Sequence, residues 1–313
     1  MAACPEQPEP RSPEGIIVKK KLITALAVLP LVALLAGCAG GSNEAATGTE
    51  DDVIKIGVIG ASDPYWDIYQ KAAADEGISI ELVDFADYQQ LNPSVSEGEL
   101  DMNQFQHLVF LADYNVSSGS DLAPIGSTAI YPLGLYSTEY DGLDDIQEGD
   151  TVAVPNDATN LARALLLLQA EDLITLDEGG TNLSGLDDID EDNSKVTVTA
   201  LEPSLTAASL ADVAAAVINN DFVEKAGLTF EGALAADDPT DADAFAYINV
   251  FASRADDKDN ETFLKLIEIF QTNQDVQDGL LAVSGDTAVP LAATTAELEE
   301  SLAGVTTDVE NAK

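Results

Sequence analysis

The sequence has few of the side chains that thiol, zinc or general-base chemistry requires. Its 313 residues contain two cysteines, Cys4 and Cys38, and one histidine, His107. No thiol follows Cys38, which excludes a disulfide framework, a cysteine nucleophile and a Cys/His zinc site from the rest of the chain.

Basic residues are scarce as well. The chain has 13 Lys and Arg against 57 Asp and Glu, and residues 38–313 keep nine of the former and 54 of the latter. So acidic a chain is a poor candidate for binding nucleic acid or anionic lipid through its surface. Its acidity favours solubility but does not define a function.

The one basic cluster introduces an export signal. Lys19–Lys21 precede the apolar-leaning residues 22–36, a run shorter than the roughly 20 residues of a bilayer span. A basic patch, a short apolar segment and small residues are the parts of a secretory signal. Leu35-Ala-Gly-Cys38 resembles the bacterial lipobox, whose cysteine is acylated and becomes the new N-terminus. We expect residues 1–37 to be removed and Cys38 to carry palmitate or a similar lipid.

The residues before this signal do not fit it. Cys4 and four prolines lie within residues 1–15, an unusual leader for a lipoprotein, so we expect translation to begin near Val18 and residues 1–17 to be an artefact. Residues 38–52 are Gly, Ser, Thr, Ala and acidic residues without periodicity. That composition predicts a flexible tether.

Apolar strands and helical segments alternate through the rest of the chain, which predicts parallel sheets with helices on both faces. More than ten such elements in about 275 residues indicate two α/β lobes. We expect strands at residues 53–59, 79–83, 124–128, 133–136, 151–155, 195–201, 213–218 and 247–251, and helices at 65–76, 104–114, 160–171, 204–210, 260–272 and 275–281.

Arginine is the next informative residue, because only Arg163 and Arg254 follow the signal. Arg163 lies in the predicted first turn of an apolar helix. A helix N-terminus offers unpaired N–H groups, and a guanidinium beside it can hold a carboxylate through two parallel bonds. The spacing therefore predicts an anion pocket, with a structural salt bridge to one of the many carboxylates as the alternative. Arg254 is expected to be paired or solvated.

A second polar cluster is Asn103-Gln-Phe105-Gln-His107. In a helix that begins near Asn103, Asn103 and His107 share one face, whereas in an extended segment Asn103, Phe105 and His107 all project the same way. The sequence does not choose between these. A lone histidine is more often a structural residue than a ligand contact, and Tyr88, at the end of a strand, has a core role as its alternative.

Two further segments resemble known binding motifs but lack residues that those motifs require. The segment 188–193 resembles the start of a calcium loop, yet the sixth position is not glycine and the twelfth, Thr199, is not glutamate. Gly57-Val-Ile-Gly60 lacks the third glycine of a dinucleotide fingerprint. We therefore expect neither a metal nor a cofactor.

Several blocks of sequence together resemble, in order, those of the NlpA/MetQ lipoproteins, which are methionine-binding receptors of bacterial ABC importers. The blocks run from Ile54 to about Pro290. They are residues 83–88 (VDFADY), 98–107 (GELDMNQFQH), 132–136 (PLGLY), 154–160 (VPNDATN), 163–169 (RALLLLQ), 216–219 (AVIN) and 247–249 (YIN).

The resemblance implies a two-lobed α/β fold of the periplasmic-binding-protein type II class, with a ligand cleft between the lobes. We place lobe 1 at residues 53–138 plus 242–313 and lobe 2 at residues 139–241. The chain should cross between them near 136–141 and 234–243.

The resemblance also implies roles for single residues. Arg163 is expected to hold the ligand carboxylate, while Asn219 and Asn249 meet the polar groups of its α-carbon. Three side chains, Tyr88, Phe105 and His107, are expected to line the side-chain slot. Asn103 and Asn160 are expected as supporting contacts.

The function that the resemblance implies is capture of L-methionine or a related amino acid. A lipid-anchored receptor on the extracytoplasmic side of the cell membrane would deliver it to an ABC permease with its ATPase subunit, and no catalysis or nucleic acid would be involved. Another apolar amino acid or a short peptide is the alternative ligand. The alternative functions are an exported enzyme on the same scaffold and an adhesive or interaction lipoprotein.

Overall fold

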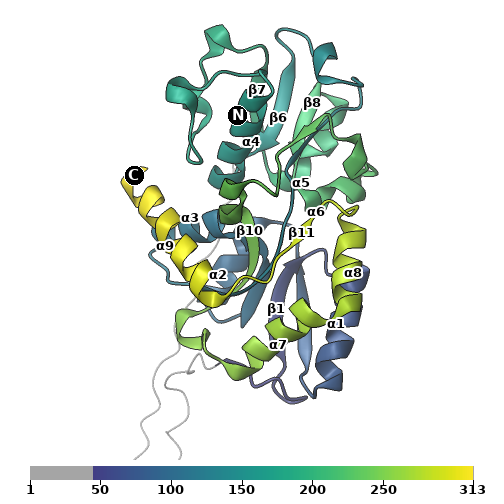
Figure 1. Cartoon of the computed structure of the whole chain (residues 1–313), viewed down its shortest axis with the longest axis vertical. Helices are drawn as coiled ribbons and strands as arrows, with labels where there is room; N and C mark the ends of the chain where they lie inside the picture. Colours follow the sequence, from purple (N-terminus) through teal and green to yellow (C-terminus); the bar gives the residue numbers. More distant parts are fainter. Residues whose placement is uncertain (1–44, 313) are drawn as a thin grey trace, which may run out of the picture. The chain divides into compact units, whose positions relative to one another are not determined.

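Two β-sheets organise the protein (Figure 1). The computed structural model describes residues 45–312, so the signal, Cys38 and residues 38–44 of the expected tether lie outside the described residues. The prediction of a flexible tether is wrong for residues 45–52, because the N–H of Ala46 donates to Asp101 Oδ1 at 2.9 Å and the carbonyl of Gly48 accepts the N–H of Ser79 at 2.8 Å. The sheet of lobe 1 has the strand order β11-β4-β10-β3-β1-β2, and the sheet of lobe 2 has the order β7-β6-β8-β5-β9.

The sheet of lobe 1 is mixed, not parallel as the alternation predicts. β1 runs parallel to β2 and β3, but β10 is antiparallel to β3 and β4, and β11 is antiparallel to β4. β10 enters from lobe 2 instead of returning through a covering helix, so its direction is not set by a βαβ unit. The strands are β1 Ile54–Ile59, β2 Ile80–Phe85, β3 Met102–His107, β4 Ala123–Ile130, β10 Ile248–Ser253 and β11 Val289–Pro290.

The sheet of lobe 2 is also mixed. β6 runs parallel to β7 and β8, whereas β5 is antiparallel to β8 and β9. The strands are β5 Gly134–Tyr136, β6 Thr151–Pro155, β7 Thr197–Leu201, β8 Ala215–Ile218 and β9 Ala235–Ala236. Since β5 pairs in this sheet, the chain leaves lobe 1 before Gly134, not near residues 136–141, and residues 134–136 do not belong to lobe 1 as predicted.

Nine α-helices flank the sheets within residues 45–312. They are α1 Pro64–Asp75, α2 Leu91–Ser96, α3 Leu108–Ser118, α4 Ala158–Ala170, α5 Pro203–Thr206, α6 Asn220–Val223, α7 Glu261–Thr272, α8 Gln274–Val283 and α9 Thr295–Ala312. α7 shows why they form where they do. Asn260 caps it by accepting the N–H of Thr262 and Phe263, and apolar residues at 263, 266, 267 and 270 are buried on one face.

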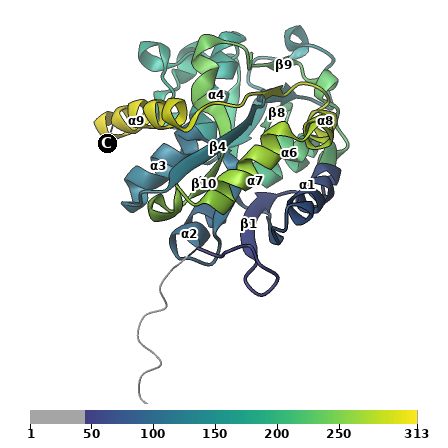
Figure 2. The same ribbon diagram turned by 60° about the horizontal axis from the view of Figure 1, so that its bottom comes forward.

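α7 lies along β4 and β10 (Figure 2), and one glycine sets how closely it approaches. A Cβ on Gly126 of β4 would collide with the side chain of Ile267. On the other side of lobe 1, α9 packs against α3 through Val305 and Val309, which meet Val109 and Ala112 in one buried cluster. Both α7 and α9 therefore pack on lobe 1.

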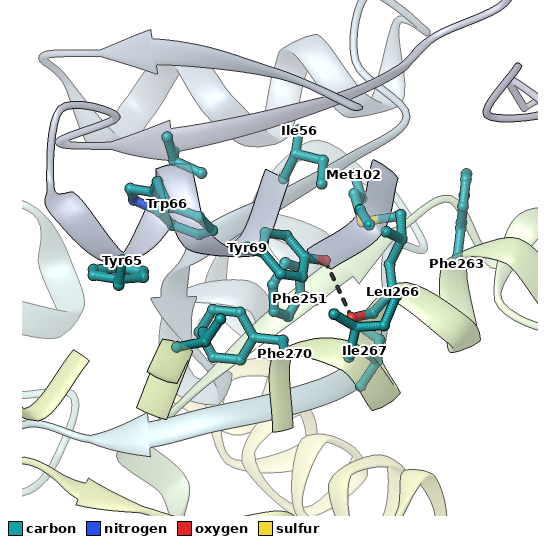
Figure 3. Close-up of a cluster of buried hydrophobic side chains, with 14 of the residues drawn as sticks. Ile56, Tyr65, Trp66, Tyr69, Met102, Phe251, Phe263, Leu266, Ile267 and Phe270 are labelled. Carbon is teal, nitrogen blue, oxygen red and sulfur yellow. Dashed lines mark hydrogen bonds between the residues drawn. The ribbon is translucent and has the colours of Figure 1, made fainter. Parts of the chain in front are cut away.

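Aromatic side chains fill the core between α1, α7 and the sheet of lobe 1 (Figure 3). Trp66 and Tyr69 of α1 meet Phe270 of α7, with ring centroids 5.9 and 5.4 Å away, and Phe251 of β10 lies 5.2 Å from Phe270. The Tyr69 hydroxyl donates to the carbonyl of Leu266 at 3.2 Å. Burying each such ring contributes about 1.5–3 kcal/mol, so this cluster fixes α1 and α7 on one rigid sheet.

Candidate ligand-binding site

A cavity lies where the two lobes meet, and side chains from both lobes line it. The space between its lining side chains amounts to about 410 Å³, a figure that includes the open mouth. Its lining residues are Tyr88, Phe105, Gln106, His107, Phe110, Tyr131, Pro132, Leu133, Asn160, Arg163, Asn219, Asn220, Asp221 and Asn249.

The structure brings together all of the predicted site residues except Asn103. Residues 102–107 form β3 and α3 starts only at Leu108, so the helix predicted from residue 104 is wrong at its start and the extended alternative is right. Phe105 and His107 therefore project to one side near the carboxyl end of the strand. Asn103 lies about 13 Å behind His107 along the strand, and its Nδ2 donates to Asn92 Oδ1 at 2.9 Å in a buried amide network.

Arg163 is buried at the edge of the cavity, in the second turn of α4 instead of the predicted first. Its Nε donates to Asp237 Oδ2 at 2.6 Å and its Nη2 to Asp237 Oδ1 at 3.1 Å. Nη2 also donates to the carbonyl of Tyr131 at 2.8 Å, and the Tyr247 ring lies 4.4 Å from the guanidinium carbon. The salt bridge considered as an alternative is thus present, and among residues 45–312 no hydrogen-bond acceptor meets Nη1.

His107 joins the two lobes as a neutral ring. Its Nδ1 accepts the N–H of Phe110 at 3.1 Å and so caps α3, and its Nε2 lies 3.4 Å from Asn160 Oδ1 in lobe 2. The Nδ1 contact makes Nε2 the protonated nitrogen, which donates to Asn160. Burial, reinforced by the charge of Arg163, lowers the pKa of His107 to about 3. Both nitrogens are therefore engaged and the ring is uncharged near neutral pH.

Three polar side chains of lobe 2 form a connected group. Asp157 caps α4 by accepting the backbone N–H of Asn160 at 2.9 Å, and it also accepts from Asn160 Nδ2. This fixes Asn160 so that its Oδ1 accepts from Asn219 Nδ2 at 3.0 Å. The other end of that amide, Asn219 Oδ1, is buried without a hydrogen-bond donor. An unsatisfied acceptor in a cavity wall indicates a site for a ligand N–H.

Aromatic rings form the opposite wall. Phe105 lies 5.7 Å from Tyr88 and 5.4 Å from Phe110, measured between ring centroids. Phe222 supports Tyr88 from lobe 2 at 5.6 Å but does not line the cavity. The rings create an apolar slot beside the polar groups, which suits a ligand with one apolar end and one charged end.

Two acidic residues near the cavity were not predicted as site residues from the sequence. Asp221 is the one carboxylate among the cavity-lining residues, and Asp237 pairs with Arg163. Asp221 follows Asn219 just beyond the carboxyl end of β8. Ligands often bind outside the carboxyl ends of strands in α/β sheets, so this position could have identified Asp221 from the sequence. Asp237 gives no comparable signal, because it stands in an acidic stretch between strands.

A second cavity of about 880 Å³, including its mouth, adjoins the first. Asp63 of lobe 1 and Lys225 of lobe 2 face each other across it. Burial, with smaller contributions from nearby acidic groups, raises the pKa of Asp63 to about 6. The two cavities share Phe105, Tyr131, Asn220, Asp221 and Asn249.

Similarity to known proteins shows the family to which this chain belongs. The sequence model of the NlpA lipoprotein family matches residues 54–291. The chain belongs to the NlpA lipoprotein family. A "D-methionine-binding lipoprotein MetQ" of Escherichia coli K12 is 36% identical over 260 residues, covering 81% of this chain and 93% of that protein.

Solved structures of similar proteins agree with the two-lobed fold. Protein PG110 from Staphylococcus aureus superposes with a TM-score of 0.76 at 30% identity, covering 80% of this chain and 99% of that one. A nutrient-binding protein from Burkholderia cenocepacia, solved bound to methionine, gives a TM-score of 0.71 at 34% identity, covering 76% and 99%. The two-lobed α/β fold expected from the sequence is therefore confirmed.

Two kinds of feature are absent from residues 45–312. None of the helices there combines the length and apolar character of a membrane span. No group of three or more His, Cys, Asp or Glu side chains in this part of the chain is arranged to hold a metal ion.

Proposed function

We propose that the protein is a lipid-anchored receptor that captures methionine outside the membrane and delivers it to an ABC importer. The observation that carries this is the pairing of two unused groups at one cavity, the Nη1 of Arg163 and the buried Oδ1 of Asn219. One is a cationic donor and the other an acceptor, as the zwitterion of an amino acid requires. The relatives named for methionine binding support the same ligand.

The carboxylate of the ligand binds Nη1 of Arg163, and its ammonium group donates to Asn219 Oδ1. Asn249 contributes from lobe 1, where its Nδ2 is held by the carbonyl of Phe105 at 3.2 Å. The thioether lies among Tyr88, Phe105 and Phe110. Sulfur–aromatic contacts of this kind contribute about 0.3–1.5 kcal/mol each, which favours methionine over an aliphatic side chain of equal length.

Acylated Cys38 anchors the receptor, and the tether lets the two lobes reach the permease. The ligand contacts side chains of both lobes, so binding favours the arrangement in which the lobes meet, as in hinge-type closure. The energy for transport comes from the separate ATPase subunit of the importer.

The rival function is an exported enzyme on the same scaffold, and the state of His107 argues against it. A general base near neutral pH needs a nitrogen that can take up a proton. The lowered pKa of His107 and the engagement of both its nitrogens make it a poor base. We therefore assign His107 to the wall of the site and to the contact between the lobes.

Calorimetry of the purified protein with L-methionine and D-methionine tests the proposal, with mass analysis of the ligand after incubation. We expect saturable binding at one site per chain and a ligand returned unchanged. Norleucine and a methionine-containing dipeptide serve as competitors. A chemically altered ligand would support the enzyme, and the absence of saturable binding would support the interaction lipoprotein.

A further inference from the structure

The two segments that connect the lobes are bonded to each other at Asp237. The first connection contains Tyr131 and Leu133, and the second begins at Asp237 after β9. The N–H of Leu133 donates to Asp237 Oδ1 at 2.8 Å, and the N–H of Asp237 donates to the carbonyl of Leu133 at 3.2 Å. Asp237 thus lies at the place where any change in the angle between the lobes must be absorbed.

The same carboxylate determines which part of Arg163 meets the cavity. Its two oxygens occupy the Nε–Nη2 edge of the guanidinium at 2.6 and 3.1 Å, and the second Nη2 hydrogen goes to Tyr131 O in the first connection. Arg163 of lobe 2 is therefore bonded to both connecting segments. Only Nη1 remains for a ligand.

The solvent exposure of Arg163 and Asp237 indicates that Asp237 stabilises Arg163, and not the reverse. The Arg163 side chain is 8% exposed and that of Asp237 is 29% exposed. Asp237 could remain in water without a partner, whereas a buried guanidinium cannot be left without one. A bidentate carboxylate also removes the rotamer freedom of a long side chain.

We propose that Asp237 is a positioning residue for ligand recognition. It fixes Arg163 so that the ligand carboxylate meets Nη1 alone, and it links occupancy of that nitrogen to the backbone of both connections. This inference rests on the proposed function, because it requires a ligand with a carboxylate.

The test compares L-methionine with L-methioninamide, which lacks the carboxylate charge, on the wild-type protein and on Asp237→Asn. Asparagine keeps an acceptor for Leu133 but loses the bidentate pair. We expect the ratio of the two affinities to fall at least tenfold. Asp238→Asn is the matched control, because Asp238 bonds Thr240 and not Arg163, and its ratio should stay within twofold of the wild type.

The direction in which the affinity ratio changes distinguishes a positioning role of Asp237 from a purely electrostatic effect of its charge. Removing a negative charge beside Arg163 would by itself strengthen binding of a carboxylate and raise the ratio. A merely structural role would weaken both ligands equally and leave the ratio unchanged. Either result would overturn the inference while leaving the proposed function intact, whereas failure of the wild-type protein to bind methionine would overturn both.

A measurement on the wild-type protein covers the case in which the variant does not fold. Amide hydrogen exchange of Leu133 and Asp237 should slow more with saturating methionine than with saturating methioninamide. Equal protection by the two ligands would show that the carboxylate does not act on the connections, and the inference would be wrong.

Discussion

The hydroxyl of Tyr88 donates a 2.6 Å hydrogen bond to Oδ2 of Asp221, and this bond joins lobe 1 to lobe 2 beside the cavity. Burial raises the pKa of the Asp221 carboxyl, while the bond from Tyr88 and the charge of Lys225 partly offset that increase. Tyr88 itself stays protonated because burial raises its pKa. The hydroxyl therefore keeps its proton near neutral pH and donates it to this partly buried carboxylate.

Tyr88→Phe should weaken methionine binding. The arrangement in which the lobes meet would then contain a partly buried carboxylate without the Tyr88 donor, at a cost of about 1–3 kcal/mol. Calorimetry should show a dissociation constant raised about 5- to 150-fold. Tyr140→Phe is the matched control, since its hydroxyl bonds Asp150 at 2.9 Å within lobe 2, and it should bind like the wild type. An unchanged dissociation constant in Tyr88→Phe would show that the bond does not support binding.

Arg163→Ala should weaken methionine binding by about 2–5 kcal/mol, as when a desolvated charge pair loses one member. The comparison variant is Arg254→Ala. Arg254 is also largely shielded from solvent and is paired with Asp257 and the carbonyls of Val95 and Leu100, but it lies away from the cavity. It should lower the free energy of unfolding without changing the dissociation constant. A loss below about 0.5 kcal/mol for Arg163→Ala would contradict the carboxylate assignment.

Phe105→Leu should reduce the preference for methionine over norleucine, which has the same length but no sulfur. The ring of Phe105 lies between Tyr88 and Phe110, and losing its contact with sulfur should cost about 0.3–1.5 kcal/mol of selectivity. Phe222→Leu alters the same aromatic cluster without touching the cavity. Competition binding should show full selectivity in that control, and an equal loss in both variants would place the thioether elsewhere.

Asp63→Asn should raise stability at neutral pH. The raised pKa of Asp63, about 6, means that the folded state holds its proton more tightly than the unfolded state, where the value is 3.8. Stability from this group is thus present at low pH and falls as pH rises from about 4 to 6. Because the side chain is only half-buried, we expect a discounted gain of about 1 kcal/mol at pH 7.

Urea unfolding at several pH values measures this effect as the difference between variant and wild type. The difference should vanish near pH 4 and be complete above pH 6. The difference between variant and wild type is needed because the titration of His107 changes the free energy of unfolding with pH in the opposite direction. Its lowered pKa makes stability rise with pH up to about 6.5, the value in the unfolded chain. A constant difference across this range would show that Asp63 is not the titrating group.

Much of the fold follows from local sequence patterns. Residues 54–59, 80–85 and 151–155 are apolar strands followed by helices or turns, and each was predicted within two residues. The segment 102–118 was harder, because Met-Asn-Gln-Phe-Gln-His fits a strand or a helix equally well. Its pairing with β1 and β10 decides the outcome. Neither the antiparallel position of β10 nor the terminal α9 was predicted.

Residue type alone pointed to the site only where the type is rare, and the family resemblance added Tyr88, Phe105, Asn160, Asn219 and Asn249, which also line the cavity. Arg163 and His107 stand out because the chain has so few arginines and histidines. Asp221 and Asp237 do not, since each is one of many acidic residues. Their partners, Tyr88 and Arg163, are 133 and 74 residues away in sequence. Only the packing of the lobes reveals such pairs.

The central place of β10 in its sheet has a consequence for biosynthesis. β10 lies between β3 and β4 but is made after all five strands of lobe 2. A nascent chain can therefore complete lobe 2 while β3 and β4 still expose unpaired edges, which are prone to pair with other chains. Incomplete chains can therefore pair with one another until residues 248–253 are made and fill the place between β3 and β4.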